Sequence, residues 1–288
     1  MTYFSLTDLI INPDGSSYHL NLRPDQIPDT LILVGDPERV PKVSVYFDEV
    51  TEIVHKREFV THLGILQGKR IGVLSSGIGA DNVEIVMNEL DALVNIDFKT
   101  RLEKVEKRAL QLIRIGTSGS IQAHIPVDSI LISTAAIGFD NLAQFYGFDS
   151  PQAISADSLA LWTKAIDYPL PLYAAKASLK LLAQFESLNA FKGLTLTAPG
   201  FYAPQGRTVR IQSIRPDFLE KVAEAKLDQQ EITNIEMETA AYYAFAGAMG
   251  HEMISLNAIL ANRITNEFSN DPEGQIRSLI EKAIALIA

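Results

Sequence analysis

Short apolar runs alternate along the chain with longer stretches in which apolar residues recur every three or four positions. Continuous apolar runs of this length are typical of strands buried on both faces of a sheet. Six segments fit: Thr30–Val34, Arg70–Ser75, Leu110–Ile115, Ser129–Ala136, Leu194–Thr197 and Ile254–Leu260. The first three lead into glycine-rich segments, which the sequence predicts as turns at strand ends: Gly35–Arg39, Gly77–Gly79 and Gly116–Gly119.

Helical spacing lies between these runs. Apolar residues spaced for one helix face follow Asp81, and Asp81 with Glu84 resembles a capping box. Proline is favoured at the first position of a helix, and glycine just past its end. Further helices are predicted from Pro171, from Pro216, over Glu238–Met249 and over Ile276–Ile287.

Strands that alternate with helices over the whole length predict one α/β domain, with helices on both faces of a parallel or mixed sheet. The segment Asp97–Arg108 interrupts this pattern, because it is dense in charge and has few apolar positions. We expect a solvated helix or a protruding arm there. A basic binding patch is the weaker interpretation, since the acids of the segment nearly offset its bases.

The net charge excludes several classes of partner. Over 288 residues, 35 acidic side chains outnumber 25 basic ones, which gives a formal charge of −10. A chain this acidic is a poor generic partner for nucleic acids or anionic membranes. The absence of cysteine excludes disulfides, thiol nucleophiles and cysteine-ligated zinc. There is no signal-like N-terminus and no apolar run of about 18 residues, so we expect a soluble cytoplasmic protein.

Arginines near the glycine-rich segments suggest an anion site. Ligands of open α/β sheets bind beyond the carboxyl ends of the strands, where glycine lets backbone N–H groups approach an anion. Arg39 follows the first glycine-rich segment, and Arg114 lies inside a predicted strand. A charge there needs a partner, so Arg114 either forms a structural ion pair or presents its guanidinium to a phosphate. Neither the Walker A nor the dinucleotide-binding pattern occurs.

Two later segments carry further candidate polar groups. In the turn-rich loop Thr197–Arg207, Gln205 and Arg207 suit paired hydrogen bonds to a planar heterocycle, although an ordinary surface loop explains the composition equally well. Glu236 and Glu238 lie two positions apart at a predicted helix start, hence on different faces, which argues against a general acid–base pair. The five histidines show no metal-binding spacing, and there is no GxSxG motif.

Five short motifs occur in the order seen in the nucleoside phosphorylase family of the purine and uridine phosphorylase type. The motifs are Gly35–Val40 (GDPERV), Lys56–Phe59 (KREF), Ser76–Gly79 (SGIG), Arg114–Gly119 (RIGTSG) and Glu236–Glu238 (EME). The chain resembles this family over about residues 18–288. The resemblance implies a single α/β domain with a central mixed β-sheet flanked by helices. It also implies an enzyme, a pentosyltransferase, that uses phosphate to split a nucleoside into a base and ribose 1-phosphate.

Two places favour the uridine phosphorylase branch of the family. Phe201 followed by Gln205-Gly206-Arg207 resembles the Gln-x-Arg element of that branch. Purine phosphorylases and related nucleosidases are expected to carry an aspartate general acid where this chain has Asn262, followed by Arg263. An asparagine side chain cannot protonate a purine leaving group, so the purine interpretation loses support.

The resemblance also implies roles for individual residues. The phosphate-binding set would be Gly35, Arg39, Arg57, Arg114 and Thr117, with Arg57 supplied by a neighbouring subunit. The ribose-binding set would be Met237 and Glu238, with His19 of the neighbour near the 5′-hydroxyl. The uracil-binding set would be Phe201, Gln205, Arg207 and Arg263.

No cofactor is required by the implied reaction, in which inorganic phosphate is the co-substrate. Glu58, beside Ile78, matches the family's monovalent-cation ligand and suggests a potassium ion, but Asn82 stands where a serine is usual. The expected partners are a small-molecule nucleoside, phosphate and further copies of the chain. The assembly is expected to be at least a dimer, with a hexamer as the larger alternative, and to involve neither nucleic acid nor membrane.

Other organisations and functions remain open at this point. Within one domain spanning 1–288, residues 1–17 are interpreted as an N-terminal extension and 97–108 as a charged insertion. One alternative is a phosphorylase that prefers another nucleoside, such as thymidine, deoxyuridine or a purine nucleoside. Another is a non-catalytic nucleoside-binding protein on the same scaffold, which is disfavoured because every phosphate-binding arginine is present.

Overall fold

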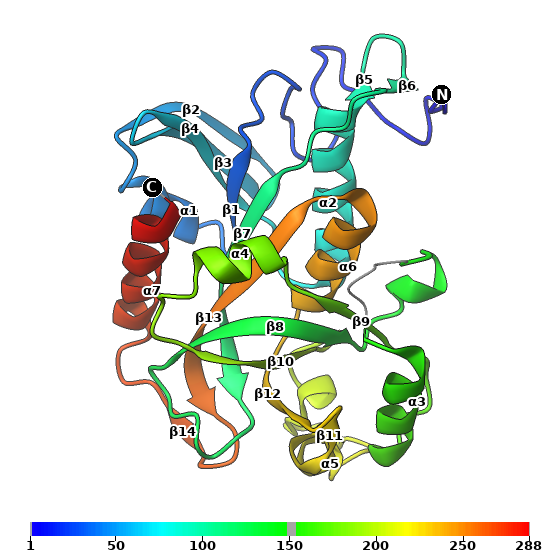
Figure 1. Cartoon of the computed structure of the whole chain (residues 1–288), viewed down its shortest axis with the longest axis vertical. Coiled ribbons are helices and arrows are strands. Elements are labelled where there is room, and N and C mark those ends of the chain that lie inside the picture. Colours follow the sequence, from blue (N-terminus) through cyan, green and yellow to red (C-terminus); the bar gives the residue numbers. More distant parts are fainter. Residues whose placement is uncertain (1, 149–153, 288) are drawn as a thin grey trace.

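Strands and helices alternate along the chain, as the hydrophobic pattern predicts (Figure 1). The computed structural model describes residues 2–148 and 154–287. The strands are β1 (Thr30–Val34), β2 (Glu49–Lys56), β3 (Phe59–Leu66), β4 (Lys69–Ser75), β5 (Ile96–Asp97), β6 (Leu102–Glu103), β7 (Gln111–Ser120), β8 (Ile130–Gly138), β9 (Tyr173–Lys176), β10 (Phe191–Thr197), β11 (Lys226–Leu227), β12 (Gln230–Glu236), β13 (Glu252–Asn262) and β14 (Glu267–Phe268). The helices are α1 (Arg39–Ser44), α2 (Ala80–Asn95), α3 (Ala156–Ala165), α4 (Leu179–Gln184), α5 (Phe218–Glu224), α6 (Thr239–Met249) and α7 (Pro272–Ile287), with 3₁₀ turns η1 (Leu142–Gln144) and η2 (Ala203–Gln205).

Twelve strands form one mixed sheet in the order β11-β12-β10-β8-β13-β7-β1-β4-β3-β2, with β9 paired to β8 and β14 to β13. Parallel pairs such as β1 with β7 occur beside antiparallel pairs such as β2 with β3. Because β12 also pairs with β7, the strands β7, β13, β8, β10 and β12 close on themselves as a small barrel. The prediction of a single-domain α/β fold with a mixed sheet is confirmed.

The central strand β1 shows how helices are held on both faces of the sheet. Leu31 and Leu33 pack in the same core as residues of α2 and α6, whereas Ile32 and Val34 pack in the same core as residues of α1 and α7. Successive side chains of a strand point to opposite faces, so one continuous apolar run contributes to two cores. Figure 1 shows these two pairs of helices on opposite flanks of the sheet.

Two local predictions at glycine-rich segments are wrong. The segment Gly116–Gly119 is not a turn but part of β7, because its backbone continues to pair with β13 and, at Gly119, with β12. Helix α2 has no capping box. Its N-cap is Gly79, with φ of 98°, and Asp81 lies inside the first turn. The left-handed entry into the helix favours glycine over a residue with a capping side chain.

The helix predicted from Pro171 is also wrong in its first half. Residues 173–176 form β9, which pairs with β8. Tyr173 and Ala175 face the core while Lys176 is exposed, so the period is two rather than 3.6. The helix α4 starts only at Leu179, after Ser178 caps it by accepting the Leu181 N–H. The helices predicted from Pro216, over Glu238–Met249 and over Ile276–Ile287 correspond to α5, α6 and α7.

The charged segment Asp97–Arg108 begins in a small hairpin, β5 paired with β6. Figure 1 shows this hairpin projecting beside the N-terminus. Arg101, at φ of 58°, donates to the carbonyls of Phe4, Ser5 and Leu9 and so ties the N-terminal segment to the hairpin. The protruding arm is therefore the correct one of the two forms predicted. Among the described helices, none is long and apolar enough to cross a membrane.

Candidate active site

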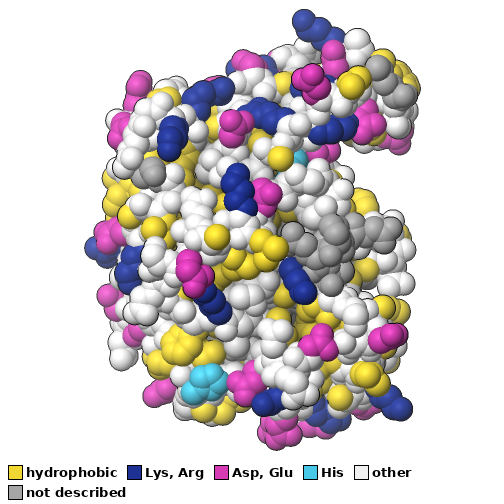
Figure 2. All heavy atoms as spheres, viewed as in Figure 1, with side chains coloured by type: hydrophobic (Ala, Val, Ile, Leu, Met, Phe, Trp, Pro, Cys, Tyr) yellow, Lys and Arg dark blue, Asp and Glu magenta, His cyan; other side chains and the backbone are white. Residues whose placement is uncertain are grey.

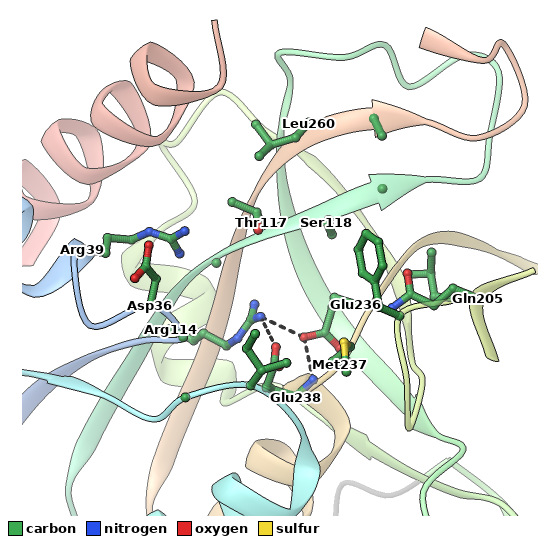
Figure 3. A pocket seen from close by; sticks show the side chains of 18 of the residues that line it. Asp36, Arg39, Arg114, Thr117, Ser118, Gln205, Glu236, Met237, Glu238 and Leu260 are labelled. Carbon is green, nitrogen blue, oxygen red and sulfur yellow. Dashed lines mark hydrogen bonds and ion pairs between the residues drawn. The ribbon is translucent and has the colours of Figure 1, made fainter. Parts of the chain in front are cut away.

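A cavity of about 710 Å³ opens where β1, β4 and β7 end, next to the start of α6. Ten of the residues singled out from the sequence line it: Gly35, Arg39, Glu58, Arg114, Thr117, Phe201, Gln205, Arg207, Met237 and Glu238. In the close view of Figure 3, Arg39 lies at one end of the cavity and Gln205 at the other, with Arg114 and Glu238 between them. The structure thus brings together segments that lie up to about two hundred positions apart in the chain.

Two buried guanidinium groups define one end of the cavity. Arg39 is 9% exposed, and its Nη1 donates to the Ile115 carbonyl at 3.2 Å. Burial lowers the pKa of Arg39, and the neighbouring Arg114 charge lowers it further. Gly35 and Thr117 line the same region. Two neighbouring cations in a largely buried site favour a bound anion.

Arg114 is bound to two carboxylates. Its Nη2 lies 2.6 Å from Glu238 Oε2 and 3.0 Å from Glu236 Oε2, and Nη1 donates to Ser255 and Asn257 at 3.2 and 3.1 Å. Arg114 therefore forms the buried ion pair of the first alternative and also lines the cavity, and its contact with phosphate stays a prediction. Three of its five N–H groups donate hydrogen bonds within the protein, to Ser255, Asn257 and Glu238.

The carboxylates of Glu236 and Glu238 both contact Arg114. They can do so because the two residues do not belong to the same helix. Glu236 is the last residue of β12, whereas Glu238 is the N-cap of α6. The prediction that different helix faces separate them is wrong for this reason. Burial raises the pKa of the Glu238 carboxyl, and the Arg114 charge opposes that shift. Glu238 Oε1 also accepts the Gly79 N–H at 2.8 Å, and Met237 lines the cavity between the two acids.

The other end of the cavity carries an aromatic ring, an amide and a guanidinium. Arg207 stacks on Phe201, with the guanidinium carbon 3.8 Å from the ring centroid, and donates to Gln205 Oε1 at 2.6 Å. Burial lowers the pKa of Arg207 to about 10, with a further contribution from the charge of Arg263. Arg263 does not line the cavity, but its Nη1 donates to the Gln205 carbonyl at 2.9 Å. Gln205 is thus held from both sides.

Asn262 is directed away from the cavity and into a turn. Its amide donates to the carbonyls of Gln122 and Ile125, and its oxygen accepts the N–H groups of Ile264 and Thr265, all at 2.9 Å. Every hydrogen-bonding position of the side chain is therefore used to hold the end of β13. The side chain is available neither as a proton donor nor as a base-reading group.

Two of the predicted residues lie outside this chain's cavity and close to each other. His19 stacks edge-on against Tyr18, with 4.8 Å between ring centroids, and its Nδ1 is 2.7 Å from Glu89 Oε1. The Arg57 guanidinium lies 5.8 Å from the centroid of the same tyrosine ring. Arg57 occupies the turn between β2 and β3 with φ of 57°. Both side chains therefore belong to one surface region around Tyr18.

Glu58 and Asn82 flank Gly77 at the cavity wall, since a Cβ on Gly77 would lie 3.1 Å from Glu58 Cγ and 2.5 Å from Asn82 Nδ2. Asn82 donates to the Ile78 carbonyl at 3.2 Å, and Ile78 and Glu58 both line the cavity. Within the described residues, no group of three or more histidine, aspartate or glutamate side chains suits a metal ion. The potassium site stays a prediction.

We expect Gly116→Ala to weaken phosphate binding. A Cβ at this position would lie 2.0 Å from Arg114 Nη1 and 2.4 Å from its Cζ, and Arg114 cannot retreat without leaving its buried carboxylates. The measurement is the phosphate concentration dependence of the rate, with an expected loss of about 10²-fold in affinity or activity from a misplaced arginine. Gly119→Ala is the matched control, since its Cβ would meet only ordinary contacts from 3.5 Å outward. Equal phosphate dependence in both variants would contradict the claim that a Cβ at position 116 displaces Arg114.

The fold places buried arginines and an aromatic cluster at opposite ends of one cavity in an α/β domain, and comparison with known proteins identifies the family. The family profile described as the phosphorylase superfamily matches residues 29–288. The chain belongs to this superfamily, and the prediction from the ordered motifs is confirmed.

Three similar proteins carry names that bear on substrate. A uridine phosphorylase from Thermococcus kodakarensis is 30% identical over 96% of this chain and 88% of its own length. The crystal structure of a Trypanosoma brucei nucleoside phosphorylase, described as showing uridine phosphorylase activity, superposes with a TM-score of 0.83 at 27% identity, covering 97% of this chain and 98% of that one. A DeoD-type purine nucleoside phosphorylase from Bacillus cereus (strain AH187) is 26% identical over 93% of this chain and 97% of its own.

Proposed function

We propose that this protein is a uridine phosphorylase. In the reaction, a phosphate oxygen forms a bond to C1′ of the ribose, and the bond from C1′ to N1 of uracil breaks. The electron pair of that bond leaves with uracil, and ribose 1-phosphate is the second product. The observation that carries the proposal is one cavity with two buried arginines at one end and the Phe201, Gln205 and Arg207 cluster at the other.

The arginine end binds phosphate. Arg39 and Arg114 supply guanidinium donors, and Gly35 and Thr117 supply backbone and hydroxyl groups at the same end. Phosphate is already a nucleophile at neutral pH, so the protein contributes positioning and charge compensation rather than a general base. Because Nη1 of Arg114 already donates to Ser255 and Asn257 in the free protein, a phosphate contact through both Nη1 and Nη2 requires one of these hydrogen bonds to be exchanged.

Met237 and Glu238 hold the ribose. The Glu238 carboxylate accepts hydrogen bonds from ribose hydroxyls, and its place beside Arg114 brings the sugar next to the phosphate. As C1′ develops positive charge in the transition state, the adjacent phosphate dianion stabilises it. These steps require no cofactor.

Phe201, Gln205 and Arg207 hold uracil, with Arg263 behind Gln205. Negative charge develops on the two oxygens of the departing base, and the Gln205 amide and the Arg207 guanidinium donate to them. The Gln205 oxygen accepts one hydrogen bond from Arg207, and its second lone pair accepts the uracil N3–H. Asn262 offers no acid for a purine, which supports uridine over inosine although a purine phosphorylase is among the similar proteins.

The substrate preference is tested by initial rates with uridine, deoxyuridine, thymidine and inosine at saturating phosphate. We expect the highest kcat/KM with uridine or its deoxy form and negligible rate with inosine. Activity on inosine alone would contradict the substrate assignment. Tight uridine binding in calorimetry without turnover would favour the non-catalytic alternative instead.

The functional unit is a homodimer or a larger assembly in the cytoplasm, in which a second copy completes each site. The position of Arg57 and His19 around Tyr18, outside the cavity of their own chain, supports this arrangement. On the face in Figure 2, basic and acidic side chains are interspersed, which agrees with small-molecule rather than nucleic-acid partners. Light scattering of the purified protein distinguishes a dimer from a hexamer.

Subunit mixing tests the shared site. We expect Arg39→Ala and Arg57→Ala proteins each to be nearly inactive, because each lacks one phosphate contact in every site. After mixing and subunit exchange, hybrid dimers contain one site with both arginines, so part of the activity returns. Exchange is followed with differently labelled subunits. Confirmed exchange with no regain of activity would show that Arg57 does not act across an interface.

A further inference from the structure

A continuous chain of buried polar side chains crosses the interior of the barrel from Arg114 to Ser118. Each of the five barrel strands contributes one member: Asn257 from β13, Ser133 from β8, Thr195 from β10, Asn234 from β12 and Ser118 from β7. The first four are 0% exposed and Ser118 is 9% exposed. Polar groups are costly in a barrel interior unless they are hydrogen bonded, and here each is bonded to the next.

The direction of every hydrogen bond in this series of side chains is fixed. Arg114 can only donate, and its Nη1 donates to Asn257 Oδ1 at 3.1 Å, which leaves Asn257 Nδ2 to donate to Ser133 Oγ at 3.0 Å. At the far end, Thr195 donates its single hydroxyl hydrogen to Asn234 Oδ1 at 2.8 Å. Ser133 must therefore be the donor in its contact with Thr195.

The series of hydrogen bonds ends at the Ser118 hydroxyl, whose hydrogen is still available. Asn234 Nδ2 donates to Ser118 Oγ at 2.9 Å, so Ser118 is an acceptor within the chain. In the part of the protein that the structure describes, no group accepts the Ser118 hydrogen. Ser118 lines the cavity, and in Figure 3 it lies between Thr117 and Gln205, toward the Gln205 end.

We propose that this one-directional relay makes the Ser118 hydroxyl a hydrogen-bond donor to a carbonyl oxygen of the bound base, with Thr195 and Asn234 as positioning residues. The proposal rests on the proposed function, because that function puts a base at this end of the cavity. A chain of hydrogen bonds that starts at a guanidinium is polarised along its length. Its last donor is therefore suited to an oxygen on which negative charge develops.

Thr195 gives the sharpest test, because it is fully buried and is not part of the cavity wall. Thr195→Val keeps the shape but breaks the relay, whereas Thr195→Ser keeps the hydroxyl and removes a methyl group. The relay predicts that Thr195→Val lowers kcat/KM for uridine about three- to tenfold, as expected for loss of one hydrogen bond to the substrate, and that Thr195→Ser stays near the unmutated value. Side-chain packing alone predicts the reverse order.

Ser118→Ala should produce a similar loss, and adding Thr195→Val to it should lower kcat/KM no further, because both changes remove the same donor. Thr61→Val is the control. Thr61 is a fully buried threonine of β3 outside the cavity wall, and its Oγ1 has no hydrogen-bond partner among the described residues, so the change should leave kcat/KM within about twofold.

The possible outcomes separate the relay from the proposed function. No release of uracil by the unmutated protein would contradict the proposed function itself. Normal activity of the unmutated protein, together with equal kcat/KM for the valine and serine variants or additive losses with Ser118→Ala, would overturn the relay. Melting temperatures of all variants show that the protein compared is folded.

Discussion

Arg114→Ala is expected to lose nearly all phosphorolysis and to be less stable than the unmutated protein. The side chain is 4% exposed and bound to Glu236 and Glu238. Its removal leaves two acids facing each other without a cation, and breaking a buried ion pair in this way costs about 3–5 kcal/mol. The loss of a guanidinium from the phosphate site lowers the rate by a further 10²–10³-fold, on the order found for one oriented donor in a transition-state site.

Melting temperature and phosphate dependence, measured on the same preparations, separate the two effects. Arg114→Lys is the informative control, because it restores a charge between the acids but not a planar fork of donors. It should recover stability more than activity. A variant that melts early but shows the unmutated phosphate dependence would assign Arg114 to the structural ion pair alone.

Cytidine is expected to be a poor substrate, with kcat/KM lower than that of uridine by about 10²–10⁴-fold. Uracil presents an N3–H between two carbonyl oxygens, which matches the Gln205 oxygen flanked by the Gln205 amide and the Arg207 guanidinium. Cytosine has no hydrogen on N3 and carries an amino group at C4. The cytosine N3 and the Gln205 oxygen would then be two acceptors facing each other, and the C4 amino group and Arg207 would be two donors. Each buried mismatch costs about 1–3 kcal/mol.

Gln205 cannot simply turn over to accommodate cytosine. Arg207 donates to Gln205 Oε1 at 2.6 Å and also to the Phe201 carbonyl at 2.7 Å, so a flipped amide would face a donor. Gln205→Ala should therefore lose much of the uridine rate without gaining activity on cytidine. Parallel measurement of kcat/KM for both nucleosides is the test. Comparable values in the unmutated protein would remove Gln205 and Arg207 from base recognition.

The sequence predicted those features that depend on local pattern. Continuous apolar runs located the central strands, and glycine just past a helix located the end of α6 at Gly250, where φ is 79°. Motifs in a fixed order indicated the family. The cavity-lining positions Arg39, Arg114 and Glu238 were likewise chosen from short motifs, without knowledge of how the strands pair.

Features that depend on distant contacts were missed. Glu236 was considered only as a possible partner of Glu238, because its contact with Arg114 spans more than a hundred positions and exists only once β12 pairs with β7. The pairing of β7 with β13 turns Gly116–Gly119 from a predicted turn into a strand. Ser118 drew no attention as a single serine, since its significance comes from Asn234 across the barrel. The contact between Arg114 and Glu236 had one indication in the sequence: an arginine in an apolar strand requires buried acids nearby.

The most direct test of the central claim is the stoichiometry of the reaction catalysed by the unmutated protein. Uridine and inorganic phosphate are supplied, and uracil, remaining phosphate and ribose 1-phosphate are quantified over time. The account predicts one phosphate consumed and one ribose 1-phosphate formed for each uracil released, with no uracil in the absence of phosphate. Uracil released without phosphate, accompanied by free ribose, would show hydrolysis and would contradict the assignment of Arg39 and Arg114 to a phosphate nucleophile.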